Sequence, residues 1–286
     1  MNQWLKWSGI ALALALAIWL AVPAYAWLAA DAVIERSYTL PRSLVQADSS
    51  PEAIARGARL VVLAGCTGCH GKDLAGKTLT ESGFTIAASN LRALTKTYAD
   101  EDFDRAIRRG LRPDASSLWI MPSQSYVYMH DDDVAAILGY LRALGPKGTV
   151  TPPPDFPLAA RRLISSGDLQ PIAPLALTQM PAESLGPHYD GGRYIAMIAC
   201  GSCHGGDLAG SGTAPDLNVV QRYTRTQFFQ LMRRGWSHDA HPLPVMAPLA
   251  RRRFHNFADW EIDPLYAYLK ARAAAPSMDQ ISDSVR

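Results

Sequence analysis

The first 30 residues contain one uninterrupted apolar stretch. No residue from Trp7 to Ala30 is charged, and most are Ala, Leu, Ile, Val or Trp. A helix of this length spans about 36 Å, enough to cross a bilayer core of about 30 Å. Trp7 and Trp27 lie near its two ends, where indole rings suit the membrane–water interface. The stretch therefore predicts an N-terminal transmembrane anchor within residues 1–30.

A cleaved signal peptide is the alternative interpretation of this stretch. Lys6 would be its basic flank and Ala24-Tyr25-Ala26 its cleavage site. The apolar residues continue past that site, which favours an uncleaved anchor. With either interpretation, the rest of the chain is exported.

The remaining chain has the apolar spacing of short helices joined by long loops. Capping residues and spacing predict three helices in a first region, from Pro51 towards Leu63, from Asp100 to Gly110, and from Asp131 through Leu141. A second region repeats this order, with helices expected near 188–199, 225–234 and 259–273. Thr224 and Gln227 form a capping-box pattern before the middle one. No segment has a convincing alternating strand pattern, so the predicted fold class is all-α.

The two regions are copies of one sequence unit. Residues 66–76 read CTGCHGKDLAG and residues 200–210 read CGSCHGGDLAG, at an offset of 134. Shorter matches follow at offsets of 125 to 128: Arg108-Arg109-Gly110 with Arg233-Arg234-Gly235, Met121 with Met246, and Tyr140-Leu141 with Tyr268-Leu269. Loop insertions between two copies of one domain produce such a drift.

The repeat predicts the domain organisation. We expect a juxtamembrane linker at 31–50, one domain at 51–146, a linker at 147–187, a second domain at 188–275 and a tail at 276–286. Nine prolines lie between residues 146 and 187, which indicates a semi-rigid connection. Within it, the apolar runs 158–164 and 175–180 are suited to lie against a domain surface.

Composition excludes several classes of protein. Hydrophobic residues make up 48% of the 286 residues, which argues against a disordered chain. The 28 basic and 26 acidic side chains give a net charge of +2, whereas nucleic-acid binders usually carry a clear basic excess. Four cysteines are too few for a disulfide-rich scaffold.

All four cysteines lie in two Cys-x-x-Cys-His motifs, the attachment sequence of a c-type haem. Two thiols at this spacing reach the two vinyl groups on one porphyrin edge, and the adjacent histidine becomes the proximal iron ligand. Cys66, Cys69 and His70 would hold one haem, and Cys200, Cys203 and His204 a second. A thioredoxin-like pair needs a strand–helix context, and a zinc site usually has its pairs closer in sequence. Covalent haem is the favoured interpretation, and we expect no disulfide.

The sixth iron ligand is predicted from the repeat. Met121 and Met246 occupy matching positions beside prolines, between the middle and last helices of each copy. A thioether there would fill the sixth coordination position of the iron. A methionine on an apolar loop also fills core gaps, so this assignment has rivals. They are Met129 and His130 in the first copy, and Met232, His238 and His241 in the second.

Together, the Cys-x-x-Cys-His, Arg-Arg-Gly, methionine-loop and Tyr-Leu motifs resemble those of class I cytochrome c domains, over residues 51–146 and 188–273. The chain is similar to the membrane-anchored di-haem cytochromes c of the bacterial periplasm. The resemblance implies two tandem all-α haem domains whose first and last helices cross, with Gly57 and Gly191 facing Tyr140 and Tyr268. The second copy departs slightly from the methionine–proline pattern of the family, since Ala247 separates Met246 from Pro248.

The resemblance also implies a function. It is electron transfer between a dehydrogenase or quinol-oxidising complex and a respiratory acceptor such as a terminal oxidase, with the anchor in the inner membrane. A di-haem peroxidase with one open iron is the alternative, and it requires one copy to lack its methionine ligand. No separate catalytic centre is expected.

Charged and aromatic residues near the motifs have several interpretations. The run Arg251-Arg252-Arg253 would dock an acidic partner or be only a solvated basic face. Helix capping explains the paired arginines Arg108-Arg109 and Arg233-Arg234 at least as well as contact with haem propionates. Trp119 and Trp236 are expected to pack in the haem pockets.

Overall fold

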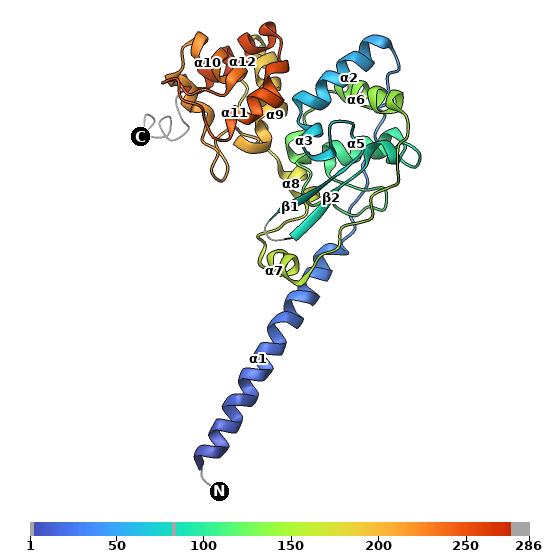
Figure 1. Ribbon diagram of the computed structural model, residues 1–286, viewed down its shortest axis with the longest axis vertical. Coiled ribbons are helices and arrows are strands. Elements are labelled where there is room, and N and C mark those ends of the chain that lie inside the picture. Colours follow the sequence, from blue (N-terminus) through green and yellow to red (C-terminus); the bar gives the residue numbers. More distant parts are fainter. Residues whose placement is uncertain (1–2, 82–83, 276–286) are drawn as a thin grey trace.

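The computed structural model describes residues 3–81 and 84–275 and shows two helical units at the end of one long helix (Figure 1). The tail predicted at 276–286 lies outside the described residues. Long helices and short helical turns follow one another along the chain, with a single hairpin among the described residues. Their bounds are α1 Gln3–Ile34, α2 Pro51–Leu63, α3 Cys66–His70, β1 Lys77–Glu81, β2 Phe84–Ala88, α4 Leu91–Leu94, α5 Asp100–Arg109, η1 Ser123–Ser125, α6 Asp131–Leu144, α7 Leu158–Ser166, α8 Ile172–Thr178, η2 Pro187–Tyr189, α9 Asp190–His204, η3 Leu217–Arg222, α10 Arg225–Arg234, α11 Met246–Arg252, η4 Phe254–Asn256 and α12 Asp259–Ala274.

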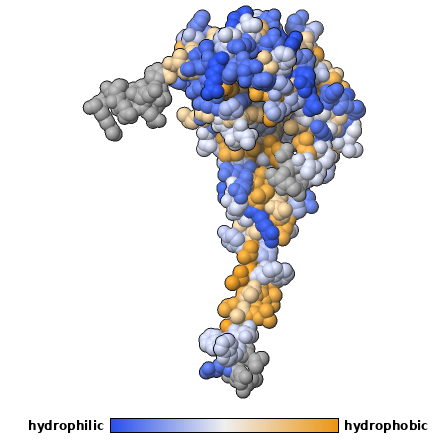
Figure 2. Space-filling view, turned by 60° about the vertical axis from the view of Figure 1, so that its left-hand side comes forward, coloured by the Kyte–Doolittle hydropathy of each residue, from blue (hydrophilic) through white to orange (hydrophobic). Residues whose placement is uncertain are grey.

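Helix α1 projects from the rest of the molecule and exposes its apolar side chains. Its segment Trp7–Ile34 is long and apolar enough to cross a membrane, by length and composition. Figure 2 shows apolar residues along this helix and mostly hydrophilic residues on the units above it. The helix therefore fits the predicted anchor.

The outer end of α1 is joined to the linker helix α7. Ala26 and Ala30 are buried, and Ala30 belongs to an apolar cluster with Phe156 of the linker. Arg161 forms an ion pair with Asp31, and its guanidinium lies 3.7 Å from the centre of the Trp27 ring. These contacts pack the outer end of α1 against the linker helix α7.

In the first unit, α2 and α6 cross closely, and α5 packs against α6. Ser50 accepts a hydrogen bond from Ala53 N and caps α2, which begins at Pro51 as predicted. A Cβ atom on Gly57 would lie 2.0 Å from Ala136 O and 2.9 Å from Tyr140 Cβ. The predicted glycine–tyrosine crossing is confirmed here.

The second unit repeats this arrangement with α9, α10 and α12. The capping box predicted at Thr224 and Gln227 is present, and α10 has its predicted bounds. The glycine prediction was wrong by one residue. A Cβ atom on Gly192 would lie 2.0 Å from Pro264 O, whereas one on Gly191 would meet nothing within 4 Å. Since successive helical residues point about 100° apart, only one of two adjacent glycines faces the crossing.

The hairpin β1–β2 was not expected from the sequence. Its strands are antiparallel, and Lys77 pairs with Ala88 and Leu79 with Ile86. The strands contain few large apolar side chains, so they lack the alternation that marks a half-buried strand. Ile86 packs against the apolar cluster near α1, which fixes the hairpin on the first unit.

The linker contains two helices, α7 and α8, in the apolar runs that were expected to lie on a surface. Ile172, Ala173 and Ala176 of α8 are buried. Ile172 N donates to Leu118 O at 2.9 Å, which attaches α8 to the first unit. The linker is thus packed against that unit rather than free.

The two units share an interface built from residues close to their cysteine motifs. Leu63 is buried in the core of the second unit, and Ile198 in the core of the first. Arg59 forms two hydrogen bonds of 2.7 and 2.8 Å with the carboxylate of Glu261. Tyr194 of the second unit donates to Asp133 of the first. These contacts fix the position of one unit relative to the other.

Candidate functional site

Each unit presents its Cys-x-x-Cys-His motif as a helical turn. The first motif forms α3, and the second forms the last turn of α9. The backbone that follows is the same in both: Gly71 and Gly205 have φ +82°, and the next turn ends at Leu74 and Leu208, which are buried with φ of 58° and 65°. A helical turn places residues three apart on one face, so both cysteines of each motif share a side.

The two histidines have matching hydrogen bonds. His70 Nδ1 lies 2.8 Å from Ser89 O, and His204 Nδ1 lies 2.8 Å from Pro215 O. A carbonyl can only accept, so Nδ1 carries the proton and the lone pair is on Nε2. Burial lowers the pKa of His70, which favours the neutral ring that an iron ligand needs.

The four thiols are free, and each motif has one enclosed and one exposed sulfur. Cys66 and Cys200 are partly buried, and burial raises the pKa of each thiol to about 11. Cys69 and Cys203 are exposed. Two thiols on one helical face and one imidazole with a free Nε2 fit a covalently bound haem at each motif.

Each predicted methionine ligand packs at the edge of the same core as its motif. Met121 and Cys66 border the core of the first unit, and Met246 and Cys200 border that of the second. Met246 is the first residue of α11. This placement is compatible with the predicted ligand role.

The rival methionines lie inside the same two cores, and the rival histidines lie nearer the surface. Met129 and Met232 are fully enclosed in the two cores, with 2% and 3% of their surface exposed. His130 is exposed and stacks on Tyr194, with ring centres 3.9 Å apart. The His238 ring meets the edge of Tyr223, and His241 is exposed. Met121 and Met246 stay the predicted ligands, and these residues stay their rivals.

The paired arginines join helices within each unit. Arg108 pairs with Asp104 of α5 at 2.5 Å and with Asp131 of α6 at 2.6 Å. Arg233 pairs with Asp259 of α12 at 2.5 Å and donates to Phe257 O. Both arginines thus attach the middle helix to the start of the last helix. The paired arginines also lie in the last turns of α5 and α10, as helix capping predicts.

Two other expectations are corrected. Arg251 and Arg252 are exposed, but Arg253 is buried between the units, so the three do not form one solvent-exposed basic run. Trp119 packs against Phe156 of the linker, with ring centres 5.0 Å apart, in the apolar cluster that includes Ala30 of α1. The sequence did not predict where Trp119 and Arg253 lie, because the residues that they contact are distant in sequence.

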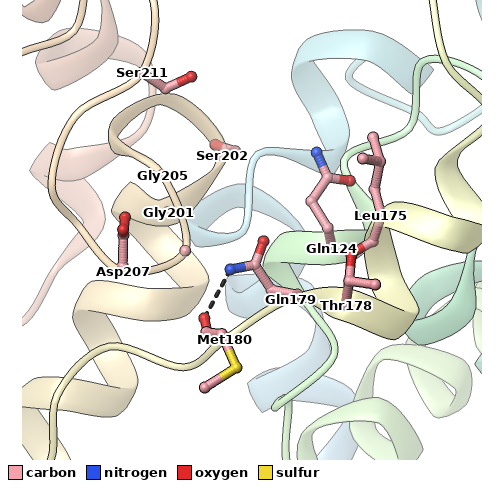
Figure 3. Close-up of a pocket in the computed structure, with 11 residues that line it drawn as sticks. Gln124, Leu175, Thr178, Gln179, Met180, Gly201, Ser202, Gly205, Asp207 and Ser211 are labelled. Atoms are coloured by element: carbon pink, nitrogen blue, oxygen red, sulfur yellow. Dashed lines mark hydrogen bonds between the residues drawn. The ribbon is translucent and has the colours of Figure 1, made fainter.

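An open pocket of about 440 Å³ lies beside the second motif (Figure 3). Gly201, Ser202 and Gly205 form one side, and Gln124 with the linker residues Leu175 to Met180 forms the other. Gly206 leaves room for the side chain of Gln179, whose amide donates to Met180 O at 2.7 Å. The linker therefore covers part of the second attachment segment.

Comparison with known families identifies the first unit. Residues 54–145 match the cytochrome c family model, and these residues form a cytochrome c domain. This domain implies covalently attached haem c. The chain is thus mostly helical, with a cytochrome c domain and an apolar N-terminal helix.

Curated relatives extend the similarity beyond the first unit. The fructose dehydrogenase cytochrome subunit of Gluconobacter japonicus is 24% identical over 84% of this chain and 57% of its own length. A di-haem c-type cytochrome of Cereibacter sphaeroides is 27% identical over 52% of this chain and 56% of its own. The cytochrome c subunit of a quinone-dependent alcohol dehydrogenase from Gluconacetobacter polyoxogenes is 27% identical over 55% and 36%. The chain spans 36–57% of the length of these relatives, and they support an electron-transfer role.

Proposed function

We propose that the chain is a membrane-anchored di-haem cytochrome c that relays single electrons. Its haem domains are residues 51–146 and 188–275, on the periplasmic side of a bacterial inner membrane, with α1 as the anchor. The donor is a dehydrogenase or a quinol-oxidising complex, and the acceptor is a respiratory protein. The names of the relatives support this class of partner.

One observation carries the proposal of two haems. The whole attachment geometry occurs twice, including the 2.8 Å contact between histidine Nδ1 and a backbone carbonyl. A disulfide role for the cysteines would not require a histidine held with Nε2 free in both copies, and among the described residues no group of three or more His, Cys, Asp or Glu side chains is placed to hold a zinc ion. The repeated geometry thus supports haem at Cys200, Cys203 and His204 as well as at the first motif.

The chain's own residues determine what the site does. Bound haem iron supplies one-electron chemistry by changing between the ferric and ferrous forms. His70 and His204 orient their Nε2 atoms through the carbonyl hydrogen bonds, which also raise ligand basicity. Met121 and Met246 would each offer a thioether to the iron, which would leave it no position for a substrate. The interface between the units holds the two motifs at a constant separation.

Covalent haem per chain tests this proposal. The full chain is expected to carry two haems by mass spectrometry after denaturation. A Cys66→Ala/Cys69→Ala variant and a Cys200→Ala/Cys203→Ala variant are each expected to carry one. A full chain with a single covalent haem would contradict the proposal. So would a Cys200→Ala/Cys203→Ala variant that still carries two haems.

A further inference from the structure

Arg253 is a buried cation at the junction of the two units. Only 9% of its surface is exposed, although the preceding residue Arg252 is exposed. Its Nε donates to Leu63 O at 2.5 Å, at the C-terminal end of α2. A side chain from the second unit thus ends beside the residues that lead into Cys66 of the first.

The guanidinium fills the space beside a glycine next to Cys66. A Cβ atom on Gly65, which has φ +88°, would lie 3.1 Å from Arg253 Cζ and Nη1. Any larger residue at position 65 would therefore both strain the backbone and displace Arg253. Gly65 thus makes room for the Arg253 guanidinium directly before Cys66, the first attachment cysteine.

The charge of Arg253 reaches the attachment segments of both units. Its guanidinium lies against Gly65, next to Cys66, and Leu63, whose carbonyl accepts from Arg253, is buried in the core that Cys200 borders. Burial raises the pKa of both thiols, and Arg253 lowers it. Tyr126 lies in the same region. Its hydroxyl donates to Ala64 O at 2.6 Å, and its pKa is raised by burial and by Cys66, Cys69 and Cys203.

This positive charge is not compensated within the described residues 3–81 and 84–275. No Asp or Glu forms an ion pair with Arg253 there, and its Nη2 is buried without a hydrogen-bond partner. A buried cation without a partner is costly, so such a residue is expected to have a role. The ring centre of Phe254 lies 5.2 Å from Cζ, which gives a cation–π contact but no countercharge.

We propose that Arg253 is a positioning residue shared by both haem sites, whose buried charge favours the ferrous form of the two irons. The inference rests on the proposed di-haem function. Oxidation adds one positive charge to an iron centre, and a nearby cation in a water-poor interface opposes that addition. The hydrogen bond to Leu63 holds the charge between the segments.

Reduction potentials of the full-length, detergent-extracted protein test this role. Arg253→Gln removes the charge and keeps hydrogen-bond donors, and it is expected to lower the reduction equilibrium constant of both haems at least tenfold. That change equals 59 mV for a one-electron couple. Arg253→Lys keeps the charge and is expected to keep both potentials near those of the wild type. The matched control Arg252→Gln removes an exposed charge one residue away and should change each constant less than twofold.

The outcomes separate this role from the proposed function. A wild-type chain without two haems contradicts the proposed function. Two haems in every variant, with potentials unchanged in Arg253→Gln or lowered equally in Arg253→Lys, contradict the role of Arg253. Arg253→Met is the second neutral variant, and the tenfold decrease is required of whichever neutral variant keeps two haems.

Discussion

At the residue scale, the cysteines and histidines of the two motifs could be predicted from the sequence because covalent attachment fixes their spacing. The structure adds the Ser89 and Pro215 carbonyls that orient the histidines. These carbonyls follow their motifs by 19 and 11 residues, and backbone acceptors carry no residue-type signal. The position of Arg253 could not be predicted, because its burial depends on a contact with Leu63, which lies 190 residues earlier.

The methionine assignment leads to a prediction at this scale. Met121→Leu is expected to remove about half of the weak far-red absorption that reports sulfur on ferric iron, since one of two sites loses its thioether. The affected iron should also bind carbon monoxide. Met246→Leu should have the same effect at the second site. Optical spectra of the oxidised and carbon monoxide-treated proteins measure both changes.

The rival methionines are the controls. Met129→Leu and Met232→Leu conserve volume in the two cores, where both side chains are buried, and cost less than about 1.5 kcal/mol. Both variants should keep the full far-red absorption. Loss of the band in Met129→Leu, with the band retained in Met121→Leu, would reverse the assignment in the first unit.

At the scale of elements, the helices were predictable because caps and apolar spacing are local signals. Pro51, the acidic first turns at Asp100 and Asp131, and the Thr224 capping box all lie at helix starts. The hairpin was missed because its pairing depends on a facing strand rather than on its own pattern. The choice between two adjacent glycines was also missed, because it depends on the angle at which α9 meets α12.

At the two helix crossings, replacing glycine by alanine is expected to change the stability of the protein in opposite directions at different positions. Gly192→Ala would place a methyl group 2.0 Å from Pro264 O and is expected to destabilise the protein by about 1–3 kcal/mol. Gly57→Ala, facing Ala136 O at the same distance, should do likewise. Gly191→Ala enters open space in a helix and should stabilise by about 0.5–1 kcal/mol. Urea unfolding of the three variants measures the differences, and equal destabilisation by both α9 variants would refute the close crossing.

At the scale of the whole molecule, the arrangement of the units could not be derived from the sequence. A proline-rich linker allows many placements, and the structure selects one through Leu63, Ile198, the Arg59–Glu261 pair and the Tyr194–Asp133 contact. Helix α8 further attaches the linker to the first unit. The two motifs therefore lie in units that pack against each other rather than on separately tethered domains.

The exposed apolar helix α1 predicts how the molecule partitions. The full chain is expected to remain with membranes through a high-salt wash and to be released only by detergent, because the span Trp7–Ile34 is apolar and outside the folded units. A chain beginning at residue 36 behind a cleavable signal peptide is the control and should appear in the soluble fraction with the same haem content. Immunoblots and haem assays of each fraction make the comparison. Release of the full chain by salt alone would contradict an anchor.

An optical redox titration of the full-length protein, with haem quantified per chain and carbon monoxide added afterwards, tests the central claim most directly. The account predicts two low-spin haems per chain, both with far-red sulfur absorption in the ferric state, and neither binding carbon monoxide readily. Such a result would show two closed one-electron centres, as a relay requires. One haem per chain, or one high-spin haem that binds carbon monoxide readily, would contradict the account.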